Sequence, residues 1–132
     1  MVKLTNDIKD SLAAARLAWL ATASKDSTPN VVVVAAVRLL DDESLLISDQ
    51  YFLKTLANIL ENPKVAVSWW GDKGGFQIKG MASVHTDGPV FKDNVEWMKA
   101  KWPKFVPKGA VVVKIADAYQ LKAGPDAGKK LL

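Results

Sequence analysis

The chain has 132 residues, of which 49% are hydrophobic and 24% are charged, which is enough for one domain with its own core but not for two. It contains no cysteine and one histidine, which excludes a disulfide scaffold and a thiolate metal site and argues against a multi-histidine metal cage. The net charge of +4 favours anionic partners in general, from nucleotides to nucleic acid.

The first half of the chain predicts one helix followed by strands. Apolar residues at helical spacing predict a helix over residues 4–16, and a strand follows over 16–23. Residues 30–40 are rich in valine and predict one strand, buried on both faces, with a dimer partner or a ligand covering one of them. A polar hairpin loop leads into a strand over 45–48. The longest apolar run, 31–37, is too short to span a membrane and no secretory signal is visible, so we expect a cytoplasmic protein.

The middle of the chain predicts a helix between two strands. The helix covers about residues 53–61 and ends at Asn62-Pro63, because proline disfavours the helical conformation in the residue before it. Strands follow over 65–70 and 76–86, and Gly80 inside the second indicates a bulge or a close backbone approach.

A last helix and strand complete the predicted domain. The helix begins at Asp87-Gly88-Pro89, the strand covers 110–115, and residues 119–121 extend it. Residues 124–132 have no core-forming pattern and are predicted to be a mobile tail. About six strands with about three helices before, between and after them indicate an α+β, mainly β fold with an antiparallel barrel in a single domain.

The start of the middle helix carries the clearest functional signal. Lys54 and Thr55 lie in its first turn, where backbone N–H groups have no partner within the helix and form a site for an anion. A lysine charge and a threonine hydroxyl there predict a phosphate site and hence a phosphorylated cofactor. The alternative is a solvated helix start, since lysine is usually exposed. Asn58, one turn later, either supports the same site or is a surface amide.

Three segments, in this order and at this spacing, resemble one known family. They are LATASKDSTPNVVVV (20–34), FLKTLANILENPKVAV (52–67) and GFQIKGMASVHTDGP (75–89). They resemble the FMN-binding split-barrel superfamily, which includes pyridoxamine 5′-phosphate oxidase, and most closely its short single-domain FMN-binding proteins. The resemblance covers about residues 10–116. It implies a six-stranded antiparallel split β-barrel with about three flanking helices and one FMN-binding domain over 1–132.

The resemblance also implies roles for individual residues. In the family, the FMN phosphate is held at the start of the central helix, which corresponds to Lys54 and Thr55, with Asn58 in support. Ser48 and Asp49, at the end of the preceding strand, correspond to a further ribityl and phosphate contact. No metal ligand is implied.

The flavin ring and the partner subunit are implied to meet further residues. Val32, Val33 and Val34 correspond to the positions that line the isoalloxazine ring, largely through backbone contacts. The family is homodimeric with its flavins at the subunit interface, so Trp69 and the turn at Gly75 are expected to approach the partner's cofactor.

The aromatic residues allow more than one interpretation. Trp69 and Trp70 place one ring on each side of a strand, so one is expected in the core and the other beneath the last helix or a dimer partner. Stacking on a flavin or a substrate is the alternative. Trp102 and Phe105 are placed to reach a cofactor from the C-terminal loop. The lone His85 is expected to be structural, and no acid–base catalyst is assigned.

The resemblance implies a homodimeric FMN-binding flavoprotein that acts as an oxidoreductase or an electron-transfer protein. Pyridoxamine 5′-phosphate oxidase activity itself is not expected, because AGPDAGKKLL (123–132) offers no arginine–histidine pair for the substrate phosphate. The superfamily also has branches that bind a deazaflavin or haem, and a non-catalytic flavin carrier or sensor is a further alternative. Binding of single-stranded nucleic acid is a remote one, because the basic residues do not line up with aromatics along one groove.

Overall fold

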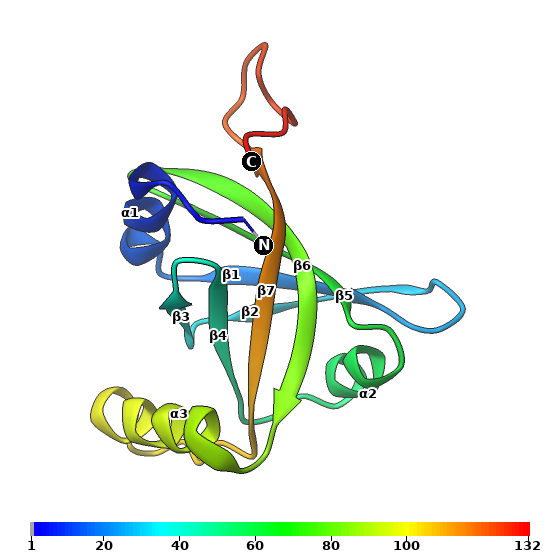
Figure 1. The fold of residues 1–132 in the computed structure, drawn as a ribbon, viewed down its shortest axis with the longest axis vertical. Coiled ribbons are helices and arrows are strands. Elements are labelled where there is room, and N and C mark those ends of the chain that lie inside the picture. Colours follow the sequence, from blue (N-terminus) through cyan, green and yellow to red (C-terminus); the bar gives the residue numbers. More distant parts are fainter. Residues whose placement is uncertain (1) are drawn as a thin grey trace.

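The computed structural model describes residues 2–132 as a curled, seven-stranded antiparallel sheet with three helices around it (Figure 1). The α+β, mainly β class is as the sequence predicts. The elements in chain order are α1 (Asn6–Ala14), β1 (Ala18–Ala23), β2 (Pro29–Val34), β3 (Val37–Asp41), β4 (Ser44–Asp49), α2 (Lys54–Glu61), β5 (Lys64–Gly71), β6 (Gly74–His85), α3 (Gly88–Lys101) and β7 (Gly109–Gln120). The strand order is β2-β1-β5-β6-β7-β4-β3.

The predicted count of six strands is wrong, because the single strand expected over residues 30–40 is two strands. β2 pairs with β1 and β3 pairs with β4, and the chain changes neighbours at Ala35 and Ala36. The Ser48 N–H donates to the Ala36 carbonyl at 3.0 Å at this corner. Valine and alanine favour extended structure without a turn signal, so the sequence pattern runs through the corner unbroken.

The same corner explains why the sheet curls. β2 and β3 are the two outermost strands in the sheet order, yet only two residues join them. The sheet must therefore bend until its two edges meet at this point. Inward-facing apolar residues fill the interior, among them Leu20, Val67, Ile78 and Val113, and α1 packs Ile8 and Leu12 over one end of it.

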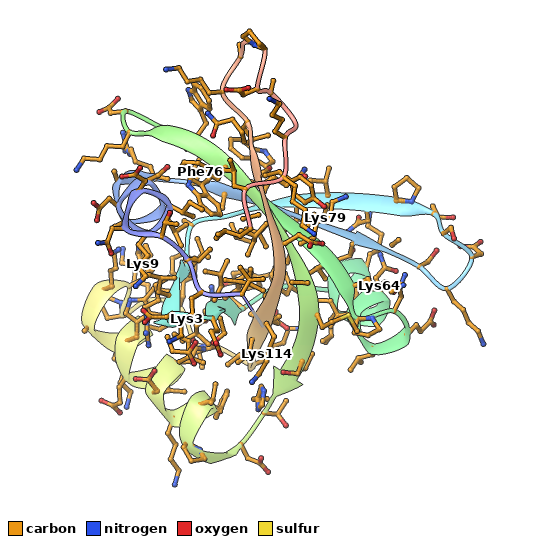
Figure 2. All side chains as sticks on the ribbon, turned by 45° about the horizontal axis from the view of Figure 1, so that its top comes forward. Lys3, Lys9, Lys64, Phe76, Lys79 and Lys114 are labelled. Atoms are coloured by element: carbon orange, nitrogen blue, oxygen red, sulfur yellow. The ribbon has the colours of Figure 1, made fainter. Side chains whose placement is uncertain are left out.

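Gly80 marks a close approach between β6 and β7, as the sequence predicts. The register between these strands shifts at Lys79 and Gly80, and a Cβ atom on Gly80 would lie 2.2 Å from the Lys114 carbonyl oxygen. Figure 2 shows that Lys9, Lys64, Lys79 and Lys114 belong to different elements, so these charges form no single cluster.

The C-terminal segment lies against β7. The Leu131 N–H donates to the Ala118 carbonyl at 2.7 Å, Lys130 forms an ion pair with Asp117 at 3.0 Å, and Leu132 packs against the core. The structure thus gives residues 124–132 defined contacts, and their mobility stays a prediction. None of the helices within residues 2–132 is both long enough and apolar enough to cross a bilayer.

Candidate functional site

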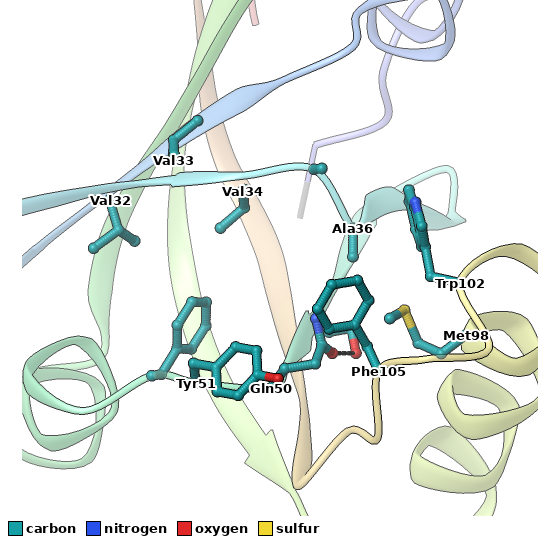
Figure 3. A pocket seen from close by; sticks show the side chains of 12 residues that line it. Val32, Val33, Val34, Ala36, Gln50, Tyr51, Met98, Trp102 and Phe105 are labelled. Atoms are coloured by element: carbon teal, nitrogen blue, oxygen red, sulfur yellow. Dashed lines mark hydrogen bonds between the residues drawn. The ribbon is translucent and has the colours of Figure 1, made fainter.

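A cavity of about 360 Å³ lies between the β2–β3 corner, the segment after β4 and the C-terminal end of α3 (Figure 3). Its volume falls in the range of small-molecule sites, roughly 300–1,000 Å³. Its wall is mainly aliphatic and aromatic, and it consists of Val32, Val33, Val34, Ala35, Ala36, Ser48, Gln50, Tyr51, Phe52, Met98, Trp102 and Phe105. All three valines predicted to line a ring therefore border one cavity.

The three valines do not present the same atoms to that cavity. Side chains alternate along a strand, and Figure 3 shows Val32 and Val34 directed to the side of Tyr51 and Gln50, while Val33 points the other way. The Val33 side chain is 55% exposed on the outer face of the sheet, opposite Trp19. Val33 thus offers the cavity its backbone, whereas Val32 and Val34 offer it apolar surface.

Aromatic side chains face the valines across the cavity. Trp102 and Phe105, which the sequence places near a cofactor, both line it. Tyr51 packs edge-to-face against Phe105, with ring centroids 6.2 Å apart. Nothing in the sequence pattern singled out Tyr51 or Phe52, since both lie in the turn before α2 and reach the wall only through tertiary structure.

The start of α2 follows directly on the cavity wall at Phe52. Its N-cap residue, Leu53, makes no side-chain capping bond to the N–H groups of the first turn. The exposed Lys54 has no ion-pair partner among residues 2–132. An uncapped helix start with a free cation is suited to an anion.

Thr55 and Asn58 face inward rather than towards solvent. The Thr55 hydroxyl oxygen accepts from Asn30 Nδ2 at 3.1 Å, and the same amide lies 3.2 Å from Thr22 Oγ1. Asn58 Nδ2 also donates to Thr22 Oγ1, at 3.0 Å. This polar cluster ties the start of α2 to β1 and β2. Its members Thr22 and Asn30 were not predicted as site residues, although strand alternation places both on the inner face.

Ser48 lines the cavity, but Asp49 does not. The Asp49 side chain is fully buried, its Oδ1 accepts from the Phe52 N–H at 2.8 Å, and its Oδ2 lies 3.6 Å from Lys108 Nζ. Lys108 also donates to the Phe52 carbonyl at 2.5 Å. Burial raises the pKa of the Asp49 carboxyl, against the opposing effects of the Phe52 hydrogen bond and the Lys108 charge. Asp49 and Lys108 together shape the segment between β4 and α2.

Trp69 and Gly75 lie away from this cavity. Trp69 is 1% exposed, and its Nε1 donates to Ser11 Oγ at 3.0 Å within the core. A Cβ atom on Gly75 would lie 2.2 Å from the Trp69 carbonyl oxygen, so this glycine permits a tight β5–β6 hairpin. Trp70 is the exposed member of the pair, in agreement with the interpretation that one ring belongs to the core. Contact of Trp69 or Gly75 with a partner's cofactor stays a prediction.

Comparison with known proteins places the chain among proteins of this fold. The family model described as pyridoxamine 5′-phosphate oxidase matches residues 4–122. An uncharacterized protein of Methanocaldococcus jannaschii is 47% identical over 132 residues, which cover 98% of this chain and 88% of that protein.

Two solved structures illustrate the likeness of fold. The HupZ protein of Group A Streptococcus has a TM-score of 0.83 at 24% identity and covers 95% of this chain and 99% of its own. An FMN-binding protein of Syntrophomonas wolfei has a TM-score of 0.74 at 17% identity and covers 89% of this chain and 86% of its own.

Proposed function

Because the chain belongs to the pyridoxamine 5′-phosphate oxidase family, we propose that it is an FMN-binding flavoprotein that transfers electrons or a hydride. One observation carries this: an apolar and aromatic cavity ends at Phe52, two residues before the uncapped, lysine-bearing start of α2. FMN joins a flat apolar ring to a phosphate, so it needs both environments side by side. The structurally similar protein of Syntrophomonas wolfei is an FMN-binding protein.

The residues present fit FMN in a defined way. Lys54 and the first-turn N–H groups of α2 bind the phosphate, while Val32 and Val34 hold one face of the ring. The aromatic side chains of Trp102 and Phe105 keep water from that part of the cavity. Bound FMN supplies the redox chemistry, and the protein supplies binding and orientation.

We also propose that the protein is a homodimer, which forms through the outer face of β1, β2 and β5. Apolar side chains gather there and are left open by the rest of residues 2–132: Leu17, Trp19, Val31, Val33 and Trp70 are each at least one-third exposed. Trp19 lies opposite Val33 in the β1–β2 register, and Val31 lies on the same face of β2 as Val33, so these three side chains are neighbours in one apolar patch. An exposed apolar patch of this kind indicates a protein interface, and a second copy brings the same patch to it.

Among residues 2–132, neither arginine nor histidine lines the cavity, so we do not propose oxidation of pyridoxamine 5′-phosphate, whose phosphate needs such partners. The choice between an electron-transfer protein and a passive flavin carrier depends on turnover. Reduction of bound flavin by NADH or NADPH, followed by transfer to an added acceptor, supports electron transfer. Flavin that stays oxidised with both donors supports a carrier.

The decisive experiment is the visible absorption spectrum of the purified protein together with the mass of the released ligand. Bound FMN supports the proposed function. A deazaflavin or haem overturns the choice of cofactor and points to another branch of the superfamily. Colourless protein that also fails to bind added FMN overturns the flavoprotein function altogether.

A further inference from the structure

A buried amide next to Ser48, which lines the cavity, has its orientation fixed by the backbone. Asn94 on α3 is fully buried, and its Nδ2 lies 3.3 Å from the Gly109 carbonyl oxygen and 3.0 Å from Ser48 Oγ. A backbone carbonyl can only accept a hydrogen bond. The Asn94 atom that faces it must therefore be the amide nitrogen.

This orientation occupies one of the two acceptor sites of the Ser48 oxygen and leaves its hydrogen in need of an acceptor. Because Asn94 donates to the Ser48 oxygen, the single hydroxyl hydrogen of Ser48 remains available for another acceptor. The structure gives it one: Ser48 Oγ donates to Oε1 of Gln50, the contact drawn as a dashed line in Figure 3. The Gln50 oxygen is thereby held towards Ser48, and its Nε2 group is held on the other side.

Gln50 lines the cavity, and no group among residues 2–132 accepts a hydrogen bond from its Nε2. We propose that this Nε2 donates to a carbonyl oxygen of the bound isoalloxazine ring, an inference that rests on the proposed FMN binding. The ring carbonyls lose water on entering a wall of valine, alanine and aromatic side chains, and a buried acceptor without a donor is costly. Gln50 provides that donor.

Asn94 and Ser48 are positioning residues for the ring carbonyl, because they act on it through the Gln50 amide. A reversed Gln50 amide would face the ring carbonyl with a second acceptor. The chain of hydrogen bonds from Gly109 through Asn94 and Ser48 disfavours that arrangement. The cavity is therefore selective for a ligand that presents an acceptor to Gln50.

The test compares ligands that differ only in acceptor strength. The dissociation constants of FMN, 2-thio-FMN and 4-thio-FMN are measured for the wild type, Gln50→Met, Gln50→Glu and a control, Gln120→Met, which lies outside the cavity. We expect the wild type to prefer FMN over one of the two analogues, since sulfur accepts hydrogen bonds weakly. Gln50→Met should weaken FMN binding about three- to tenfold, the worth of one hydrogen bond, and should remove that preference.

Gln50→Glu keeps the shape of the side chain but has no donor, so FMN binding should fall at least as far as in Gln50→Met. The control should bind all three ligands as the wild type does. The role of Gln50 would be overturned if the wild type binds flavin and the Gln50→Met variant shows the same preference as the wild type between FMN and its analogues. A wild type that binds no flavin overturns the proposed function itself, so the two failures are distinguishable.

The positioning role has its own readout. Ser48→Ala should weaken FMN binding in the wild-type background and weaken it less in Gln50→Met, because Gln50→Met already removes the interaction that Ser48 supports through the Gln50 amide. The infrared carbonyl stretch of bound FMN should shift to higher frequency in Ser48→Ala and in Gln50→Met alike. Additive losses from the two substitutions, with no carbonyl shift in Ser48→Ala, would overturn the positioning role.

Discussion

Neighbouring side chains at the start of α2 separate into an exposed charge and a buried amide cluster. Lys54 projects into solvent, while Thr55 is 2% exposed and accepts a hydrogen bond from Asn30. Since residues one apart on a helix face different directions, a substitution at Lys54 changes the anion site without reaching the cluster that holds α2 to the sheet.

Lys54→Ala is expected to weaken FMN binding without changing the fold. A hydrogen bond to a charged group contributes about 1.5–3 kcal/mol, so the dissociation constant should rise roughly ten- to hundredfold. The thermal midpoint of the apoprotein should stay the same, because an exposed charge contributes little to folding. Lys64→Ala, an exposed lysine beyond the other end of α2, is the control. Wild-type affinity in Lys54→Ala, measured by fluorescence titration, would exclude Lys54 from the phosphate site.

Asp49→Asn is expected to change how stability depends on pH. Burial raises the pKa of the Asp49 carboxyl above its usual value of 3.8, so the folded state binds the proton more tightly than the unfolded state. The resulting stabilisation is complete below pH 3.8 and is lost as the pH rises through the native pKa. Asparagine never ionises and keeps an acceptor for the Phe52 N–H.

The free energy of unfolding of Asp49→Asn, relative to wild type, should therefore increase with pH across that interval. Urea unfolding at a series of pH values measures it. Asp49→Ala serves as the comparison, since it also lacks the acceptor and should lose about 1 kcal/mol. A difference between Asp49→Asn and wild type that is independent of pH would contradict the raised pKa.

At the scale of elements, local signals in the sequence located most of the helices and strands. Proline at 63 ends α2 as predicted, and the glycine at position 80 coincides with the register shift. The corner at Ala35 and Ala36 was not predicted, because it contains no turn-forming residue. Its formation depends on the pairing of β3 with β4, which the local sequence pattern does not show.

The residues of the candidate site likewise fall into those that the sequence indicates and those that only the tertiary structure shows. The helix start at Lys54 is a local pattern in the sequence, whereas the family resemblance alone pointed to Val32 and Val34, which the structure places in the cavity wall. Tyr51 and Gln50 could not be predicted, since their side chains gain a role only when the end of α3 is placed opposite them. Asn94 is a polar residue within a helix, and only the packed structure shows that it is buried.

Gly80→Ala tests the close approach of β6 and β7. The added Cβ would meet the Lys114 carbonyl oxygen at 2.2 Å, and backbone atoms in the middle of a sheet have little room to shift. We expect a loss of about 1–3 kcal/mol in the free energy of unfolding, typical of overpacking. Gly109→Ala, on β7, is the matched control because its Cβ would have no neighbour closer than 3.7 Å. Equal stability of the two variants would mean that the strands separate easily.

At the scale of the whole molecule, β2 contributes side chains both to the cavity and to the apolar patch on the outer face of the sheet. Its inward side chains line the cavity, and its outward side chains, Val31 at 61% and Val33 at 55% exposed, belong to the apolar patch on the outer face. A substitution at Val33 can therefore disrupt a subunit interface while the side chains inside the cavity stay the same.

Val33→Lys is expected to convert the proposed homodimer into a monomer, because two lysine charges would otherwise be buried against an apolar surface. Sedimentation velocity measures the change, and Leu60→Lys is the control, since Leu60 is exposed on α2 outside the patch. A flavin site completed by the partner predicts that Val33→Lys also loses FMN as it dissociates, whereas Lys54→Ala loses FMN as a dimer. Val33→Lys that remains dimeric would exclude this face as the interface, and monomeric Val33→Lys with full FMN affinity would show that one subunit holds the flavin alone.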